Sequence, residues 1–275
     1  MRGVSVNDPN RKMVFFDIDG TLIDTPTHQI PESAVRAIHR LQEKGHLAFV
    51  NSGRTFVSIE QRIKDIGFDG YVCGCGSRIY YQDEMLYFSE IPHEKCMEIV
   101  KKLRECRIAA FFEGPDAVYY DGESPVENPE MEQMKAAFQL FGITSRSLSK
   151  EMEKKKITFD KFFCLLNEES DLAGLEAYAE GEFYGTPQGK GHMEFVQNGH
   201  SKAEGIFFLQ RALHIAPENC YAIGDSENDL SMLKAVPNSI AMGVCAPEIL
   251  PWCSYQTAPV LEDGIEKALQ HYGLI

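Results

Sequence analysis

The hydrophobic pattern of the chain begins with an apolar run that ends in two acidic residues. Met13 to Phe16 are all apolar, Asp17 and Asp19 follow one residue apart, and Gly20 comes next. A short run without polar residues predicts a strand buried on both faces, as in the middle of a parallel sheet. The glycine predicts a turn, and such sheets place their chemistry at the carboxyl ends of strands. We interpret the two acids as a candidate site, with an Asx-turn that merely ends the strand as the alternative.

Helical and strand-like patterns alternate after this run. Between Pro31 and Gly45 the apolar residues recur on one helical face, and the same spacing returns before Gly67. Strands separated by single helices predict a parallel sheet with right-handed crossovers. The predicted elements are a helix over 32–44, a strand over 46–51, a helix over 55–66 and a strand over 71–73.

The last third of the chain resumes this alternation. We therefore expect both ends of the chain to form the halves of one doubly wound, Rossmann-like parallel sheet, which is an α/β fold. The predicted elements are helices over 202–213, 227–235 and 263–272, with strands over 220–224 and 239–242.

The middle of the chain follows a different pattern. Hairpin-like pairs are predicted for 78–81 with 85–89 and for 108–112 with 117–120, and helices begin at Pro92 and near Asn128. A mixed α+β domain inserted into the α/β core accounts for this change. We place the core at 1–83 and 190–275, and the inserted domain at 84–189.

Composition restricts the classes of function. The chain has 275 residues, of which 44% are hydrophobic and 25% charged, as in globular proteins that fold in water. It has no apolar run of membrane-spanning length, and its first eight residues lack the apolar region of a signal peptide, so we expect a cytoplasmic protein. The net charge of −14 argues against nucleic acid or a membrane as partner. Nothing in the sequence indicates an oligomeric state.

The eight cysteines are spread along the chain. Cys96, Cys106, Cys164 and Cys220 lie within apolar stretches, so we interpret them as reduced thiols of the core. The pair in Cys73-Gly74-Cys75 has no second cysteine pair or histidine cluster to complete a zinc site, which disfavours metal binding there.

Polar clusters follow other predicted strands. Ser52-Gly53-Arg54 follows the strand over 46–51, where a hydroxyl and a backbone amide can bind an anion, although a helix cap is the alternative. Lys202 stands at a predicted helix start, where a cation is unfavourable for the helix dipole unless an anion is bound. A solvated lysine is the alternative.

Asp225 follows the strand over 220–224 and is the first of three acids within five residues. These acids also suit the first turn of a helix. At a strand end, however, Asp225 is well placed to share a Mg²⁺ ion with Asp17, since Mg²⁺ prefers oxygen ligands. Phosphoryl transfer fits this inventory best, because a carboxylate that attacks a phosphate needs a cation and a lysine to neutralise charge.

Four segments, in order, resemble the four motifs of the haloacid dehalogenase superfamily. Residues 17–22 resemble motif one, and residues 52–54 resemble motif two. Lys202 resembles motif three, and residues 224–229 resemble motif four. Only one helix and one strand fit between motifs one and two, whereas 54–202 can hold a domain. That layout is similar to the Cof-like phosphatases, which carry a large α/β cap between motifs two and three. The sequence departs from common relatives at Cys75-Gly76-Ser77 and at His200.

The resemblance implies a role for each matched residue. Asp17 would be the nucleophile that forms an aspartyl-phosphate, and Asp19 the acid that protonates the leaving group and then activates water. Asp17, the Asp19 carbonyl and Asp225 would hold Mg²⁺. Phosphate would be bound by Ser52, Gly53 and Lys202, with Thr21, Asn228 and Asp229 in support.

The resemblance implies a Mg²⁺-dependent phosphatase that acts on a small phosphorylated metabolite. Sugar phosphates are favoured, with nucleotides or pyridoxal phosphate as alternatives. A non-catalytic protein that binds a phosphorylated ligand is the second class considered. A dehalogenase would not need Asp19, and a phosphosugar mutase would need a small cap for which motifs one and two leave no room. Phe112, Glu113 and Tyr184 are candidates for substrate contact that suit the core of the inserted domain equally well.

Overall fold

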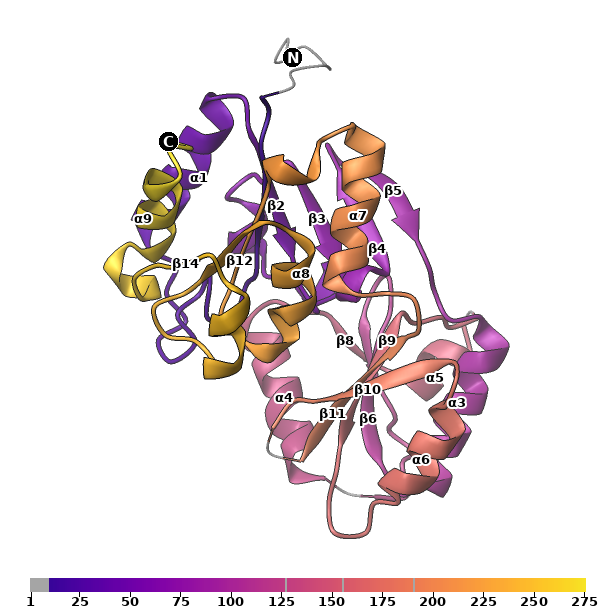
Figure 1. Cartoon of the computed structure of the whole chain (residues 1–275). Helices are drawn as coiled ribbons and strands as arrows, with labels where there is room; N and C mark the ends of the chain where they lie inside the picture. The colour runs from indigo at the N-terminus through magenta and orange to yellow at the C-terminus, as the bar shows by residue number, and fades with distance from the viewer. Residues whose placement is uncertain (1–9, 127, 155, 190) are drawn as a thin grey trace. The chain divides into compact units, whose positions relative to one another are not determined.

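The computed structural model describes residues 10–126, 128–154, 156–189 and 191–275 (Figure 1). The prediction about a signal peptide falls on residues outside this part of the chain. Two compact units are present. The first comprises the chain up to Gly53 together with Ile66–Tyr87 and Ser201–Ile275, and the second comprises Arg54–Asp65 and Phe88–His200.

The first unit is built on an eight-stranded sheet in the order β14-β13-β12-β1-β2-β3-β4-β5. The strands from β14 to β3 are parallel, and β4 returns antiparallel to β3. Strands from the two ends of the chain therefore lie side by side, which confirms the predicted doubly wound α/β core. The strands are β1 (Met13–Phe16), β2 (Leu47–Asn51), β3 (Gly70–Cys73), β4 (Arg78–Tyr81), β5 (Glu84–Phe88), β12 (Cys220–Gly224), β13 (Asn238–Ala241) and β14 (Tyr255–Gln256).

Helices cover both faces of this sheet (Figure 1). Phe15 and Phe49 stack with ring centroids 5.4 Å apart on the face where α7 (Lys202–Leu213) and α8 (Leu230–Ala235) pack. Alternation along β1 directs Val14 and Phe16 to the opposite face. There α1 (Glu32–Glu43) packs against α9 (Gly264–His271). Burial on both faces explains why β1 contains no polar residue.

The second unit contains a six-stranded sheet in the order β10-β11-β9-β6-β7-β8. One face packs on α3 (His93–Glu105) and α6 (Leu172–Ala179), and the other on α4 (Pro129–Leu140). A short helix, α5 (Leu148–Met152), follows β8. The strands are β6 (Ala109–Glu113), β7 (Val118–Tyr120), β8 (Ser145–Ser147), β9 (Lys161–Leu165), β10 (Phe183–Pro187) and β11 (His192–Gln197).

The predicted helix over 55–66 is wrong. The segment contains only a 3₁₀ turn, Phe56–Ser58, and the four-residue α2, Gln61–Lys64. Ile59 and Glu60 between them are extended, with ψ of 123° and 145°. Glu113 accepts hydrogen bonds from the Thr55 N–H and hydroxyl and from the Ser58 hydroxyl, so tertiary contacts override the helical pattern.

The second unit differs from the predicted inserted domain in two ways: its main segment is Phe88–His200 and not 84–189, and Arg54–Asp65, predicted as core, belongs to it. The hairpin of β4 and β5 extends the first sheet instead of starting the inserted domain, and β11 belongs to the second sheet. The predicted helix over 227–235 is a 3₁₀ turn, Glu227–Asp229, followed by α8. The predicted hairpin of β6 with β7 is confirmed.

Cys96, Cys106, Cys164 and Cys220 are buried free thiols, as predicted. Burial raises the pKa of Cys96 to about 12 and that of Cys220 to about 11, because a thiolate is poorly solvated there. Within the described part of the chain, no helix has the length and apolar character that a membrane span requires.

Candidate active site

The predicted acids lie at the carboxyl ends of adjacent strands. Strand β1 pairs with β12 on one side and with β2 on the other, and Phe16 is in register with both Ile223 and Val50. Asp17 therefore leaves the sheet beside Asn51 on one side and, on the other, beside Gly224, the residue that precedes Asp225. Three parallel strands thus deliver polar residues to one edge, the usual position of ligand sites in α/β sheets.

The turn after β1 separates the two acids of the opening motif. The Ile18 carbonyl accepts hydrogen bonds from the N–H groups of Thr21, Leu22 and Ile23, at 3.3, 2.9 and 2.9 Å. Asp17 is 4% exposed, whereas the following acid, Asp19, lies on the surface. One carboxylate is therefore held inside the site while the other remains accessible to solvent.

Lys202 is the buried cation of the site. Its side chain is 2% exposed, and Nζ donates to Asp17 Oδ1 at 2.6 Å and to Asp229 Oδ1 at 2.5 Å. Burial alone lowers the pKa of this ammonium, but the two carboxylates outweigh burial and raise it. Lys202 therefore stays charged, and it donates also to Asn228 Oδ1 at 3.4 Å.

Asp229 orients the loop that follows β12. Its Oδ2 accepts hydrogen bonds from the backbone N–H groups of Asp225, at 2.9 Å, and Ser226, at 3.1 Å, while Oδ1 binds Lys202. A Cβ at Gly224 would lie 2.6 Å from the Asp229 carboxyl carbon, so only glycine fits there. Both oxygens of Asp229 are thus committed to holding other site residues.

Asp225 lies against the turn of the opening motif. Its Oδ1 accepts the Thr21 hydroxyl at 3.2 Å, and its Oδ2 would lie 2.2 Å from a Cβ added at Gly20, which has a φ of +86°. Burial, followed by the charge of Asp229, raises the pKa of Asp225 to about 7. Burial and then Asp229 also raise the pKa of Asp17, although Lys202 opposes the shift.

The donor set fits a divalent cation. Carboxylate oxygens of Asp17, Asp225 and Asp229 lie within 4.8 Å of one another. Two buried carboxylates and the partly buried Asp225 face one ammonium, so negative charge is in excess and the ionised acids are disfavoured. Because Asp229 has both oxygens engaged, Asp17 and Asp225 are the side chains that suit a hard cation such as Mg²⁺.

Ser52 is held at the end of β2. It is 2% exposed, its N–H donates to the Val72 carbonyl at 2.9 Å, and its own carbonyl accepts the Cys75 N–H at 3.2 Å. Cys75 adopts a φ of +55° in this contact. Since no long helix follows, an anion at Ser52 and Gly53 would rely on these two residues without a helix dipole.

Sequence reasoning missed one residue of this arrangement. The Asn51 side chain donates to the backbone carbonyl of Lys202 at 3.0 Å, and both groups are buried. The available signal was a polar residue that ends an otherwise apolar strand.

The three residues that were considered for substrate contact have different environments. Phe112 is buried in the core of the second unit, Glu113 is paired with Lys161, and Tyr184 is 36% exposed.

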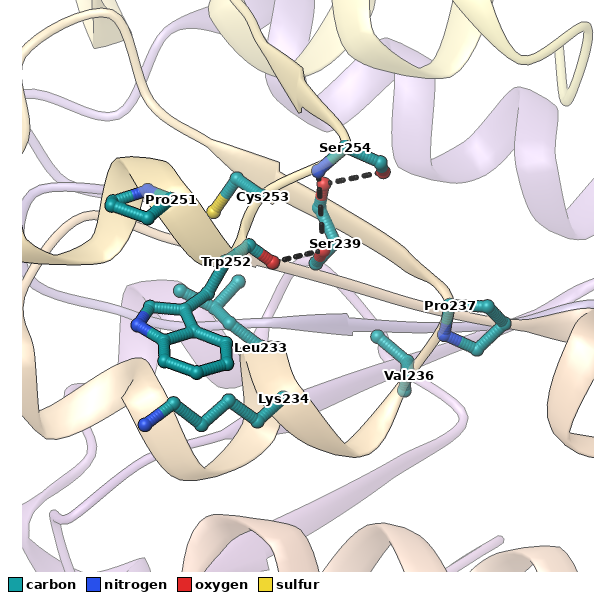
Figure 2. A pocket seen from close by; sticks show the side chains of 9 residues that line it. All are labelled: Leu233, Lys234, Val236, Pro237, Ser239, Pro251, Trp252, Cys253 and Ser254. Atoms are coloured by element: carbon teal, nitrogen blue, oxygen red, sulfur yellow. Dashed lines mark hydrogen bonds between the residues drawn. The ribbon is translucent and has the colours of Figure 1, made fainter.

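A separate hollow lies beside α8 in the first unit (Figure 2). It is lined by Trp252, Pro251 and Val236, and the Lys234 ammonium lies 3.9 Å from the centre of a Trp252 ring. The Ser239 hydroxyl donates a hydrogen bond to the Trp252 carbonyl and accepts one from the Ser254 N–H, and the Ser254 hydroxyl donates to the Ser239 carbonyl. None of the described residues that line this hollow has a carboxylate, so these residues lack the chemistry of the acidic cluster.

Comparison with known proteins identifies relatives along almost the whole chain. The family model of haloacid dehalogenase-like hydrolases matches residues 14–269. The putative phosphatase YkrA of Bacillus subtilis is 28% identical over 264 residues, which cover 96% of this chain and 98% of that protein. The B. subtilis 5-amino-6-(5-phospho-D-ribitylamino)uracil phosphatase YcsE is 23% identical, covering 98% and 99% of the two chains.

Solved structures share the fold. A hypothetical protein from Geobacillus kaustophilus superposes with a TM-score of 0.82 at 27% identity, over 96% of this chain and 100% of that one. The sugar phosphatase BT4131, of subclass IIB of the superfamily, superposes with a TM-score of 0.77 at 27% identity, with the same coverage. The resemblance inferred from the four motifs is thereby confirmed at the level of family and fold.

Proposed function

The chain belongs to the haloacid dehalogenase-like hydrolases, and we propose that it is a Mg²⁺-dependent phosphatase that hydrolyses a small phosphate monoester through an aspartyl-phosphate. The observation that carries the proposal is the ion pair of Asp17 with Lys202 inside a cluster of three acids. A buried carboxylate beside a buried ammonium suits attack on an anionic phosphate, since the ammonium offsets repulsion between the two anions.

Asp17 is the proposed nucleophile. Its Oδ1 is held by Lys202, so the side chain is fixed and its other oxygen is the one proposed to attack phosphorus. The phosphorus–oxygen bond to the leaving group breaks as the bond to Asp17 forms. Burial and neighbouring acids raise the pKa of Asp17 even though the Lys202 ammonium opposes the shift. The reaction therefore needs added positive charge to keep Asp17 ionised.

Asp19 is the proposed proton carrier. Its exposure lets it reach the oxygen of a leaving group that buried Asp17 cannot protonate. After Asp19 gives its proton to the leaving alcohol, the same carboxylate takes a proton from the water that attacks the aspartyl-phosphate. The two acids of one turn thus have different proposed roles because their exposure differs.

Lys202, Ser52 and Gly53 are the proposed phosphate ligands. The ammonium neutralises charge on the phosphoryl oxygens, and the Ser52 hydroxyl and Gly53 N–H are proposed to donate to them. Asp229 and Asn228 orient Lys202, and Thr21 orients Asp225.

The residues proposed to hold Mg²⁺ are Asp17, Asp225 and the backbone carbonyl of Asp19. The ion would supply charge neutralisation at the nucleophile and the phosphate. Support comes from burial and from the excess of negative charge around Asp17 and Asp225, which together raise the pKa of both groups.

We propose a phosphorylated metabolite as substrate, with a sugar phosphate favoured. Two proteins that are similar along nearly the whole chain support this proposal. BT4131 is named as a sugar phosphatase, and the name of YcsE contains one small phosphorylated compound. Selection among such compounds is proposed to come from the inserted domain, predicted at 84–189. A screen of phosphorylated metabolites with and without Mg²⁺ identifies the class.

The proposal predicts that the purified protein releases phosphate from p-nitrophenyl phosphate in the presence of Mg²⁺. EDTA should abolish the release, and Mg²⁺ in excess should restore it. Asp17→Asn should lose at least about 10³-fold in kcat, because the amide is not a nucleophile.

Asp263→Asn is the matched control for this measurement. Asp263 adopts a φ of +63° at the start of α9, a conformation that asparagine tolerates, and it lies outside the acidic cluster. It should retain wild-type activity. Full activity of Asp17→Asn would refute the nucleophile, and activity that persists without divalent ions would refute the metal requirement.

A further inference from the structure

Asn51 connects the end of β2 with the residue that supplies the buried cation. Its side chain is fully buried, and Nδ2 donates to the Lys202 carbonyl at 3.0 Å. We propose that Asn51 is a positioning residue of the phosphatase reaction, which sets where the Lys202 ammonium stands relative to Asp17. The inference rests on the proposed function, and it adds a residue that none of the four motifs assigns to a role.

The start of α7 is tightly constrained around this bond. Ser201 caps the helix by accepting the Glu204 N–H at 3.1 Å. A Cβ at Gly76 would lie 2.5 Å from the Ser201 carbonyl oxygen, and one at Gly205 would lie 2.3 Å from Val72. Close packing thus fixes the first turn of α7 against β3 and the turn that follows it. The bond from Asn51 adds the tie to β2, the strand adjacent to β1.

The position of this backbone decides the position of the charge. Lys202 is the first residue of α7, and its ammonium reaches both Asp17 and Asp229 within 2.6 Å. A shift of the helix start would therefore move the ammonium relative to both carboxylates. Displacements of about 1 Å can cost about 10²-fold in rate when they misplace a catalytic group. The carbonyl bond is therefore suited to holding catalytic geometry.

Stability alone does not account for an asparagine at this position. The other four residues of β2 that precede it are apolar and buried. The Oδ1 of Asn51 is buried and has no hydrogen-bond partner among the described residues. A buried acceptor without a partner destabilises the fold, and an apolar side chain would avoid that cost. Asn51 thus provides an Nδ2 donor to the Lys202 carbonyl, although its Oδ1 acceptor is buried unfavourably.

Asn51→Leu tests the proposal, because leucine has a similar volume and no donor. Thr257→Val is the matched control, since it removes another buried bond from a side chain to backbone, the Thr257 hydroxyl to the Gly264 carbonyl at 2.7 Å. Tm is measured for both variants, so that an effect on stability can be separated from an effect on activity. Only Asn51→Leu should lower kcat/KM for p-nitrophenyl phosphate, by about tenfold to 10²-fold.

A second readout reports the position of Lys202 without catalysis. The ammonium signal of Lys202 in ¹⁵N-lysine-labelled protein is identified by its absence in Lys202→Met. It should shift or broaden in Asn51→Leu and remain unchanged in Thr257→Val. Should Asn51→Leu not fold, Asn51→Ser, which replaces the amide with a hydroxyl on a shorter side chain, takes its place in both measurements.

The outcomes separate the inference from the proposed function. Wild-type protein and Thr257→Val report whether the chain is a phosphatase at all, whereas the ammonium signal reports positioning in either case. An unchanged Lys202 signal in the Asn51 variant would overturn the inference. Equal loss of kcat/KM in the Asn51 and Thr257 variants would overturn it as well, because the effect would then be one of general stability.

Discussion

Single residues of the opening motif acquire different chemistry from a single turn. Asp17 and Asp19 are one residue apart, yet the turn built on the Ile18 carbonyl buries the first and exposes the second. An extended strand would have pointed both carboxylates to the same side. The proposed roles of Asp17 and Asp19 therefore differ because of the backbone conformation at Ile18 and Gly20, since the two side chains are identical.

The exchange of Gly20 for alanine tests how closely this turn fits the acid of the neighbouring loop. The new Cβ would lie 2.2 Å from Asp225 Oδ2, and the residue has a φ of +86°. Gly20→Ala should lose more than about tenfold in kcat and lower Tm. Gly45→Ala is the matched control, because Gly45 has a φ of +85° and no atom within 4 Å of its Cβ position.

Backbone strain alone costs about 1–2 kcal/mol, so Gly45→Ala should lower Tm modestly and leave kcat unchanged. Steady-state kinetics and thermal unfolding with and without Mg²⁺ measure both effects. If the two variants behave alike, the proximity of Gly20 to Asp225 has no part in the activity.

The sequence located most residues of the candidate site but not their contacts. Asp17, Ser52 and Asp225 could be placed because each follows an apolar run that predicts a strand. The bonds of Asp229 to two backbone N–H groups, and of Asn51 to Lys202, depend on distances between side chains and backbone after folding. No periodicity in the sequence encodes those distances.

At the scale of elements, the segment after Ser52 shows how one buried charge overrides a helical pattern. Glu113 at the end of β6 accepts three hydrogen bonds from Thr55 and Ser58, and Lys161 binds its other oxygen at 2.8 Å. Lys161 is 3% exposed and binds Glu194 as well. These contacts lie within the second unit, but their partners Glu113 and Lys161 lie outside residues 55–66. The hydrophobic pattern of residues 55–66 alone therefore could not predict them.

Glu113→Gln tests the contribution of this ion pair to stability. Burial raises the pKa of Glu113, but the charge of Lys161 and the hydrogen bonds from Lys161 and Thr55 outweigh burial, so the net pKa is lowered. A lowered pKa stabilises the fold above the unfolded value and loses that effect as the pH falls through the folded value. Glu113→Gln should therefore lower the free energy of unfolding by about 3 kcal/mol at pH 7, and this difference from the wild type should decrease toward pH 4.

Urea unfolding at both pH values measures the effect of Glu113→Gln. Glu169→Gln is the control, because Glu169 pairs with Arg107 while 61% exposed, and such pairs contribute less than about 1 kcal/mol. A difference that is as large at pH 4 as at pH 7 would show that the charge of Glu113 is not what stabilises the segment.

For the whole molecule, the alternation of helices and strands was enough to predict the core. Both chain ends carry buried strands of four or five residues separated by single helices, and only one parallel sheet buries all of them. The strands β9 to β11 of the second unit were missed, since Lys161 and Glu194 interrupt their apolar pattern by pairing across the sheet. The predicted junctions at 84 and 190 cut two hairpins, β4 with β5 and β10 with β11, because the largely exposed edge strands β5 and β10 carry too little pattern to show which sheet they extend.

The central claim is that Asp17 carries the phosphoryl group during turnover, and chemical trapping tests it most directly. Protein quenched in acid during hydrolysis of p-nitrophenyl phosphate with Mg²⁺ should contain an acyl phosphate, which borohydride reduces to homoserine. Peptide mass spectrometry should find homoserine at position 17 and nowhere else, and none in protein treated with EDTA. Steady phosphate release with an unmodified Asp17, or with the label on another residue, would contradict the account.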